Sequence, residues 1–165
     1  VSPELCFNKY PFLKTLDLSE KNFGNFNGKS WSGTEEGYYS VNPANNEKIA
    51  YTTFTTLKEY EETIKNMESV RAKWMAHPMV KRGEIVKEIG EVVKQKTSEL
   101  GKLLSLEMGK IEKEGIGEVV EVTDICDYAQ GLSRTLAGKV LQSERSEHIL
   151  YENWNPLGLI GVISA

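Results

Sequence analysis

The last residues of the chain constrain its fold more than any other feature. Residues 157–163 form an apolar run interrupted only by Gly158 and Gly161, and Asn155-Pro156 opens the run with a turn. Such runs suit a strand that is buried on both faces of a parallel sheet. That strand needs neighbouring strands and a covering helix, yet the helical sequence lies before it. We therefore expect the chain to be the front part of a larger α/β protein.

Composition excludes several classes of function. Hydrophobic residues make up 39% and charged residues 27% of the 165 residues, as in ordinary globular proteins. The net charge of −4 argues against nucleic-acid binding, and no apolar stretch reaches the roughly 20 residues that cross a membrane. Cys6, Cys126, His77 and His148 lie too far apart in the sequence to suggest a metal site. We expect an intracellular protein with two reduced thiols and no metal.

The first third of the chain predicts β-hairpins. Asn27-Gly28, between Phe26 and Trp31, is typical of a type I′ turn. A second hairpin is expected around residues 42–47, because the residues on both sides alternate between apolar and polar. Residues 11–18 could make a short helix before these hairpins.

The middle of the chain predicts four helices. The first begins at a capping box formed by Thr56 and Glu59. Its apolar residues recur every three or four positions and predict one buried stripe: Leu57, Tyr60, Ile64, Met67, Val70 and Trp74. The second helix starts at Pro78 and the third ends at Gly109. The fourth covers residues 111–136, and its expected inward residues are Val119, Val122, Ile125, Cys126, Ala129 and Leu132.

Two glycine-containing segments are candidate sites. Gly158-x-x-Gly161, followed by Ser164 and Ala165, would let a ligand approach the end of the terminal strand. A tight contact between this strand and a helix is the alternative explanation. Residues 106–110, Leu-Glu-Met-Gly-Lys, are explained by a helix C-terminus alone, with glycine in the left-handed region and lysine opposing the helix dipole.

The third candidate is an acidic stripe on the fourth helix. It contains Glu114, Gly117, Glu121, Asp124 and Tyr128. A solvated helix face would explain these residues. However, Gly115 and Gly117 each cost about 1 kcal/mol relative to alanine inside a helix, which suggests that another backbone or a ligand comes close. A carboxylate beside such an approach could hold a cationic group.

Several segments, taken in order, resemble the N-terminal third of an aldehyde dehydrogenase. They are Asn27-Gly28-x-x-Trp31, Asn42-Pro43-Ala44, Leu106-Glu107-x-Gly109-Lys110 and Trp154-Asn155-Pro156-Leu157-Gly158-Leu159-Ile160-Gly161-Val162-Ile163-Ser164-Ala165. Within that superfamily, residues 105–110, 115–119 and 124–134 are similar to the antiquitin group of α-aminoadipic semialdehyde dehydrogenases. The similarity covers the chain from about Tyr10 to Ala165.

The resemblance implies an α/β fold that is incomplete in this chain. The whole fold would hold a variant Rossmann NAD-binding domain, a catalytic domain and an oligomerisation ribbon. Residues 1–142 would supply N-terminal hairpins and helices of the NAD-binding domain. Residues 143–155 would form part of the ribbon, and residues 156–165 the first strand of the nucleotide-binding core.

The resemblance also implies an activity. The family oxidises aldehydes with NAD through a thiohemiacetal on a cysteine, and the antiquitin group acts on an amino-acid semialdehyde in lysine catabolism. Ile163, Ser164 and Ala165 match the cofactor-contacting strand end of the family. Glu121 matches an acidic residue that helps to hold the amino-acid end of the substrate. The resemblance further implies a homotetramer that is located in the cytoplasm or in the mitochondrion.

The chain departs from the family pattern at its end. The family motif continues past Ala165 to an asparagine that donates to the developing oxyanion. That asparagine, the cysteine nucleophile and the glutamate base are absent here, and a thiolate at Cys126 would be disfavoured on an apolar helix face. We therefore expect no catalytic residue in the chain. The rival hypothesis is a naturally short, non-catalytic paralogue whose partner covers residues 157–163; the matches at Glu121 and Ser164 favour the enzyme.

Overall fold

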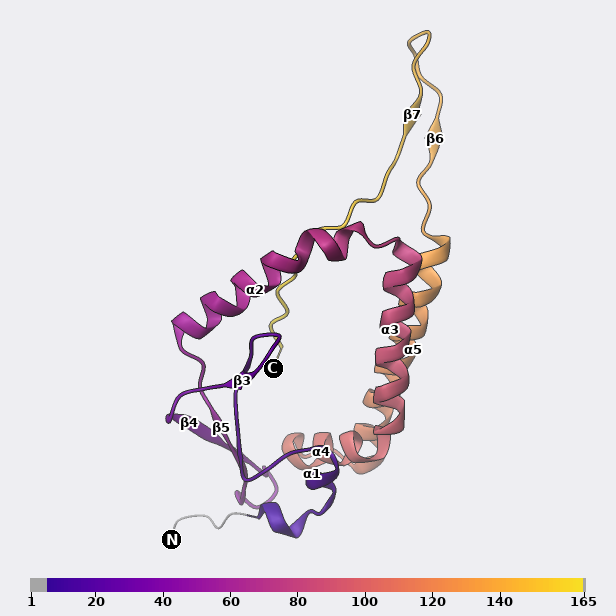
Figure 1. Ribbon diagram of the computed structural model, residues 1–165. Coiled ribbons are helices and arrows are strands. Elements are labelled where there is room, and N and C mark those ends of the chain that lie inside the picture. Colours follow the sequence, from indigo (N-terminus) through magenta and orange to yellow (C-terminus); the bar gives the residue numbers. More distant parts are fainter. Residues whose placement is uncertain (1–5, 165) are drawn as a thin grey trace.

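The computed structural model describes residues 6–164, and its elements are arranged as an open ring (Figure 1). The N-terminal elements lie toward the bottom of the view, and α2 (Leu57–Ala76) rises obliquely from the left side of the ring to its upper edge. The antiparallel pair α3 (Met79–Gln95) and α5 (Glu112–Thr135) forms one side, and α4 (Thr97–Met108) leads back to the N-terminal elements. No helix among the described residues is long and apolar enough to cross a membrane.

Both predicted hairpins are present. In one sheet, β5 (Lys48–Thr53) pairs with β4 (Gly37–Val41) antiparallel and with β1 (Lys21–Asn22) parallel. The other hairpin joins β2 (Asn25–Phe26) to β3 (Trp31–Ser32).

The turn of the first hairpin is not the predicted type I′ turn. That type needs positive φ at both central residues, whereas only Gly28, at φ +89°, has it. The side-chain oxygen of Asn27 instead accepts hydrogen bonds from the backbone N–H groups of Lys29 and Ser30, at 3.0 Å each. An Asx-type turn therefore closes a longer loop between the two short strands.

The buried core lies where the N-terminal segment meets β5 and α4. The 3₁₀ turn η1 (Phe7–Lys9) and the short helix α1 (Phe12–Thr15) bring Phe7 and Leu13 against Ile49. Helix α1 confirms the short helix expected over residues 11–18, with narrower bounds. Cys6 is fully buried in this cluster, and burial raises the pKa of its thiol.

All four predicted helices form. Helix α2 begins at the capping box of Thr56 and Glu59, and α3 follows Pro78. Helix α4 ends at Gly109, whose φ of +71° and ψ of 20° are left-handed. Helix α5 occupies Glu112–Thr135, close to the predicted range of 111–136.

Glycines allow α5 to pack closely on α3 and α4. A Cβ built on Gly90 of α3 would lie 2.8 Å from the Cβ of Cys126 on α5. A Cβ on Gly115 of α5 would lie 2.4 Å from the carbonyl oxygen of Gly101 on α4. The close backbone approach expected from Gly115 is therefore confirmed. Nothing lies within 4 Å of the corresponding position at Gly117.

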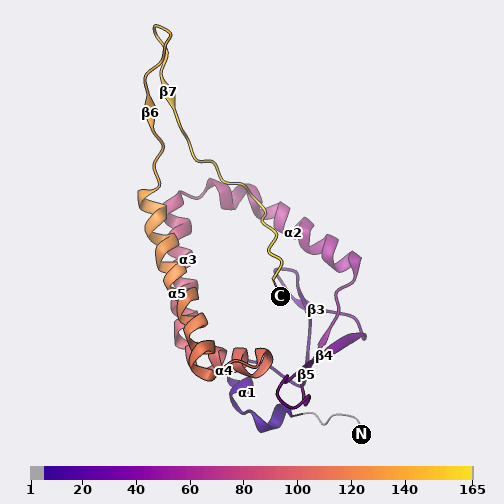
Figure 2. The same ribbon diagram turned by 180° about the vertical axis from the view of Figure 1, so that it is seen from behind.

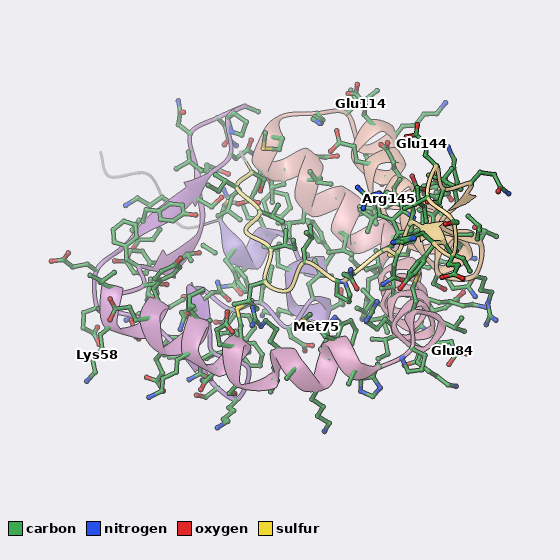
Figure 3. All side chains as sticks on the ribbon, turned by 90° about the horizontal axis from the view of Figure 1, so that it is seen from above. Lys58, Met75, Glu84, Glu114, Glu144 and Arg145 are labelled. Atoms are coloured by element: carbon green, nitrogen blue, oxygen red, sulfur yellow. The ribbon has the colours of Figure 1, made fainter. Side chains whose placement is uncertain are left out.

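A charged contact also joins α3 to α5. Glu84, labelled in Figure 3, accepts a hydrogen bond from Lys81 at 2.9 Å and lies 3.6 Å from a guanidinium nitrogen of Arg134 on α5. The hydrogen bond from Lys81, followed by the charges of Lys81 and Arg134, holds the pKa of Glu84 below its usual value.

The apolar stripe predicted to be buried on α2 is not buried by the described residues. Leu57 is 72% exposed and Val70 57% exposed, and no residue of α2 is fully buried. On α5, Val119 is buried as expected, but Val122 and Ile125 are exposed. Helical periodicity identifies which residues share an apolar face, but it does not identify what covers that face.

The buried strand expected over residues 157–163 is likewise not formed among the described residues. The segment runs from the ribbon across α2, where a Cβ on Gly158 would lie 3.1 Å from Cδ of Arg71 (Figure 2). It makes no ladder with a described strand, and Leu157 and Val162 are 86% and 85% exposed. A strand requires a neighbour to satisfy its backbone groups, and the described residues do not provide one here.

The exposed ribbon is present. Strands β6 (Val140–Leu141) and β7 (Leu150–Tyr151) pair antiparallel and project beyond the ring (Figure 1). The ribbon begins before the predicted boundary at residue 143. Val140, Ile149 and Tyr151 are among its exposed apolar side chains.

Replacing Thr56 with alanine is expected to lower the free energy of unfolding by about 1 kcal/mol at neutral pH, because the change removes a helix cap. In the capping box, the Glu59 backbone N–H donates to the Thr56 hydroxyl oxygen at 3.1 Å. The Thr56 backbone N–H in turn donates to the Glu59 carboxylate at 2.8 Å. Urea unfolding of the full-length protein measures the effect, and Thr56→Ser, which keeps the hydroxyl, is the matched control.

The cost of Thr56→Ala should shrink in acid. Hydrogen bonds from the backbone N–H and hydroxyl of Thr56 hold the pKa of Glu59 below its usual value. A carboxyl whose pKa is lowered on folding stabilises the fold above its unfolded pKa, and this contribution disappears as the pH falls through the folded pKa. A difference between wild type and variant that stays constant into acid would contradict the role of Glu59.

Candidate functional site

The acidic stripe occupies one exposed face of α5. Glu114, Glu121, Asp124 and Tyr128 are all exposed, and Gly117 lies between them without a neighbour. Glu114 points away from the other elements in Figure 3. The described residues make no hydrogen bond or ion pair with the Glu121 side chain, so its carboxylate is available to a ligand.

Asp124 has different surroundings from Glu121. It lines a hollow of about 180 Å³ between α3 and α5, together with Lys94 and Asp127. Glu121 and Asp124 lie almost one helical turn apart on the same face. The stripe thus offers two carboxylates in separate environments.

The predicted cofactor residues lie at the end of the terminal segment. Ile163 and Ser164 are exposed and belong to no strand, while Ala165 lies outside the described residues. Among the described residues, no hydrogen bond or ion pair joins this segment to Glu121. The described residues therefore show no polar contact between the two predicted parts of the site.

The segment at residues 106–110 ends α4 as predicted, and it also contacts β4 and the turn that follows β4. The hydroxyl of Ser40 on β4 donates to the carboxylate of Glu107. A Cβ on Gly109 would lie 3.0 Å from Cγ of Pro43, so the glycine sits against the hairpin turn. Two segments singled out in the sequence, 42–44 and 106–110, thus meet in space.

Sequence reasoning missed the ion pair between Lys110 and Glu118. Lys110 follows α4, and Glu118 lies in the second turn of α5. The hydrogen bond with Glu118, followed by the charges of Glu118 and Glu114, raises the pKa of Lys110. A pair that spans a turn between two helices has no periodic spacing in sequence, so no pattern could have identified it.

The described residues present exposed carboxylates but assemble no complete catalytic group. Cys126 packs against Gly90 between α3 and α5. Among the described residues, no cluster of three or more His, Cys, Asp and Glu side chains could hold a metal. What the geometry offers is an unpaired carboxylate at Glu121 and large exposed apolar faces.

Comparison with curated relatives gives high identity across almost the whole chain. The α-aminoadipic semialdehyde dehydrogenase of Rattus norvegicus is 52% identical over 157 residues, which cover 95% of this chain and 29% of that protein. The aldehyde dehydrogenase family 7 member A1 of Pisum sativum is 47% identical over 158 residues, covering 96% of this chain and 31% of that protein. The chain thus spans about a third of the length of these relatives.

Solved structures show the same fold at lower identity. The betaine aldehyde dehydrogenase from Staphylococcus aureus in complex with NAD+ is 22% identical, with a TM-score of 0.69 over 87% of this chain and 29% of that one. The lactaldehyde dehydrogenase from Escherichia coli is 23% identical, with a TM-score of 0.70 over 76% of this chain and 26% of that one. The mixed α/β arrangement is therefore part of an aldehyde dehydrogenase fold.

The sequence pattern that defines the aldehyde dehydrogenase family matches residues 31–165. This match covers β3, the hairpin of β4 and β5, the four long helices and the ribbon. Together with the relatives above, it shows that this chain belongs to the aldehyde dehydrogenase family.

Proposed function

We propose that this chain forms the N-terminal portion of an NAD-dependent aldehyde dehydrogenase. The whole protein would oxidise an amino-acid semialdehyde of the α-aminoadipic type to the carboxylate through a cysteine thiohemiacetal. The observation that carries the proposal is the 52% identity with the rat α-aminoadipic semialdehyde dehydrogenase over 95% of this chain. The cysteine nucleophile and the general base would come from sequence beyond residue 165.

Glu121 is the proposed substrate residue. An amino-acid semialdehyde carries an ammonium group at the end opposite its aldehyde, and a carboxylate is the side chain that pairs with it. Glu121 is exposed and makes no hydrogen bond or ion pair with the described residues, so it can accept from that group. It would select substrates by charge and take no part in the oxidation itself.

Ile163, Ser164 and Ala165 are the proposed cofactor residues. Ile163 and Ser164 are exposed, and the small hydroxyl side chain of Ser164 leaves room for a ligand against the main chain. These residues could hold one surface of a dinucleotide, whose nicotinamide accepts a hydride. The structure of the Staphylococcus aureus betaine aldehyde dehydrogenase in complex with NAD+ supports the use of a nicotinamide dinucleotide.

The ribbon supports a homo-oligomer, proposed as a tetramer. An isolated two-stranded hairpin is marginally stable in water. The β6–β7 ribbon projects from the ring with Val140, Ile149 and Tyr151 exposed. Pairing with a second copy would cover these side chains and stabilise the hairpin.

The test is an NADH-formation assay with the full-length protein and α-aminoadipic semialdehyde. The control substrate is an uncharged straight-chain aldehyde of similar length. We expect a higher kcat/KM for the semialdehyde than for the control. Turnover of the control alone would overturn the proposed substrate, and no NADH with either would overturn the proposed activity.

A protein that forms no NADH with either aldehyde would favour the alternative function, a structural or binding partner for another chain. The exposed apolar faces of α2 and α5 are the observation that keeps this alternative in view. In a complete dehydrogenase, the remaining sequence would cover those faces.

A further inference from the structure

Acidic residues crowd the N-terminal half of α5, and of the two lysines at this end, Lys110 and Lys113, only Lys110 forms an ion pair with one of them among the described residues. Glu112, Glu114, Glu118 and Glu121 fall within its first three turns. The ammonium of Lys110 bonds to the carboxylate of Glu118, and the charge of Glu114 also acts on it. No described residue makes such a bond to Glu121.

The position of Lys110 is fixed from several sides. Glu107 accepts from Ser40 of β4, and Gly109 is seated against Pro43 in a left-handed conformation. These contacts hold the end of α4 against the hairpin immediately before Lys110. The segment that carries the Lys110 ammonium is therefore held in place next to α5.

Glu118 and Glu121 compete for the same kind of ligand. They are three residues apart, so their side chains are neighbours on the helix surface. Moving a ligand from one to the other shifts it roughly 5 Å along the helix. Because a misplacement of about 1 Å can already cost roughly a hundredfold in rate, a substrate held on Glu118 would bind without reacting.

We propose that Lys110 is a positioning residue for substrate selection, which occupies Glu118 and so leaves Glu121 as the carboxylate that takes the substrate's ammonium group. This inference rests on the proposed function of Glu121. Lys110 touches neither the substrate nor the reacting atoms. It acts by removing a competing anchor almost one helical turn away.

The test is Lys110→Met in the full-length enzyme. Freeing Glu118 creates a non-productive complex, which competes with the productive one without altering it. We therefore expect kcat and KM for the semialdehyde to fall together by about threefold, the scale of one exposed ion pair, at unchanged kcat/KM. Both constants for the uncharged aldehyde should stay at wild-type values. The double variant Lys110→Met/Glu118→Gln should restore both constants for the semialdehyde.

A second variant tests the same idea in the opposite direction. Glu118→Gln alone leaves the ammonium of Lys110 without its partner. That ammonium then either repels the ammonium group of the substrate or pairs with Glu121. We expect a higher KM for the semialdehyde, an unchanged kcat and no effect on the uncharged aldehyde.

Two results would overturn the inference. One is an equal loss of kcat/KM for both aldehydes in Lys110→Met that is not restored in Lys110→Met/Glu118→Gln. A purely structural role of Lys110 would give this result. The other is unchanged constants in both single variants.

Glu121→Ala, measured in parallel, separates this inference from the proposed function. An unchanged KM in Glu121→Ala refutes the role of Glu121 as the substrate anchor. A raised KM there, with wild-type behaviour of the Lys110 and Glu118 variants, refutes only the role of Lys110.

Discussion

Glu121→Ala in the full-length protein is expected to raise the KM for α-aminoadipic semialdehyde about tenfold with little change in kcat. A hydrogen bond between charged groups contributes about 1.5–3 kcal/mol, and the exposure of Glu121 places the effect at the lower end of this range. The ammonium group lies far from the reacting aldehyde. Loss of its contact with Glu121 should therefore weaken binding of the ground state and of the transition state alike. Steady-state kinetics with the semialdehyde and with the uncharged control aldehyde measures the changes in KM and kcat.

Asp124→Ala is the matched control for Glu121→Ala. Asp124 carries the same charge on the same exposed face of α5, but it lines the polar hollow beside α3. Its removal should change the KM by no more than about twofold, as expected of an exposed charge without direct contact. Equal effects of the two substitutions would indicate general attraction by the stripe and would contradict a specific role for Glu121.

Gly115→Ala is expected to destabilise the protein by about 1–3 kcal/mol, the usual cost of overpacking a close contact. The added methyl would lie 2.4 Å from the carbonyl oxygen of Gly101 and 2.6 Å from the hydroxyl of Ser105. The hydroxyl can rotate away, whereas the carbonyl belongs to α4 and can move only with that helix. Urea unfolding of the full-length protein measures the loss.

Gly117→Ala provides the control two residues further along the same helix. Nothing lies within 4 Å of its added methyl. The substitution should therefore stabilise the protein by up to about 1 kcal/mol, the difference in helix propensity. Destabilisation here would mean that another part of the protein approaches this face of α5, close to Glu121.

Local sequence signals predicted local structure well. The capping box at Thr56 and the left-handed end of α4 at Gly109 each depend on neighbours within a few residues or on one backbone requirement. The close contact at Gly115 joins two helices, and the cost of a glycine inside a helix indicated it. Each segment that resembles an aldehyde dehydrogenase is a weak signal by itself. Their common order along the chain is what predicted the family.

Burial could not be predicted in the same way. The stripe on α2 and the run at residues 157–163 are apolar, yet Leu57 and Val162 are exposed. An apolar face is a property of the sequence, whereas its cover is supplied by another segment. The ion pair of Lys110 with Glu118 has the same character, since it depends on how two helices meet at their connecting turn.

The core around Leu13 and Ile49 also has a consequence for the order in which the chain acquires structure. Leu103 and Leu106 of α4 pack against this cluster, so the first fifty residues complete their core only after α4 has left the ribosome. Contacts between segments so distant in sequence form slowly, because a long loop must close first. Helices α3, α4 and α5 follow one another and pack together locally. During synthesis, the earliest residues of the chain would therefore be among the last to be protected.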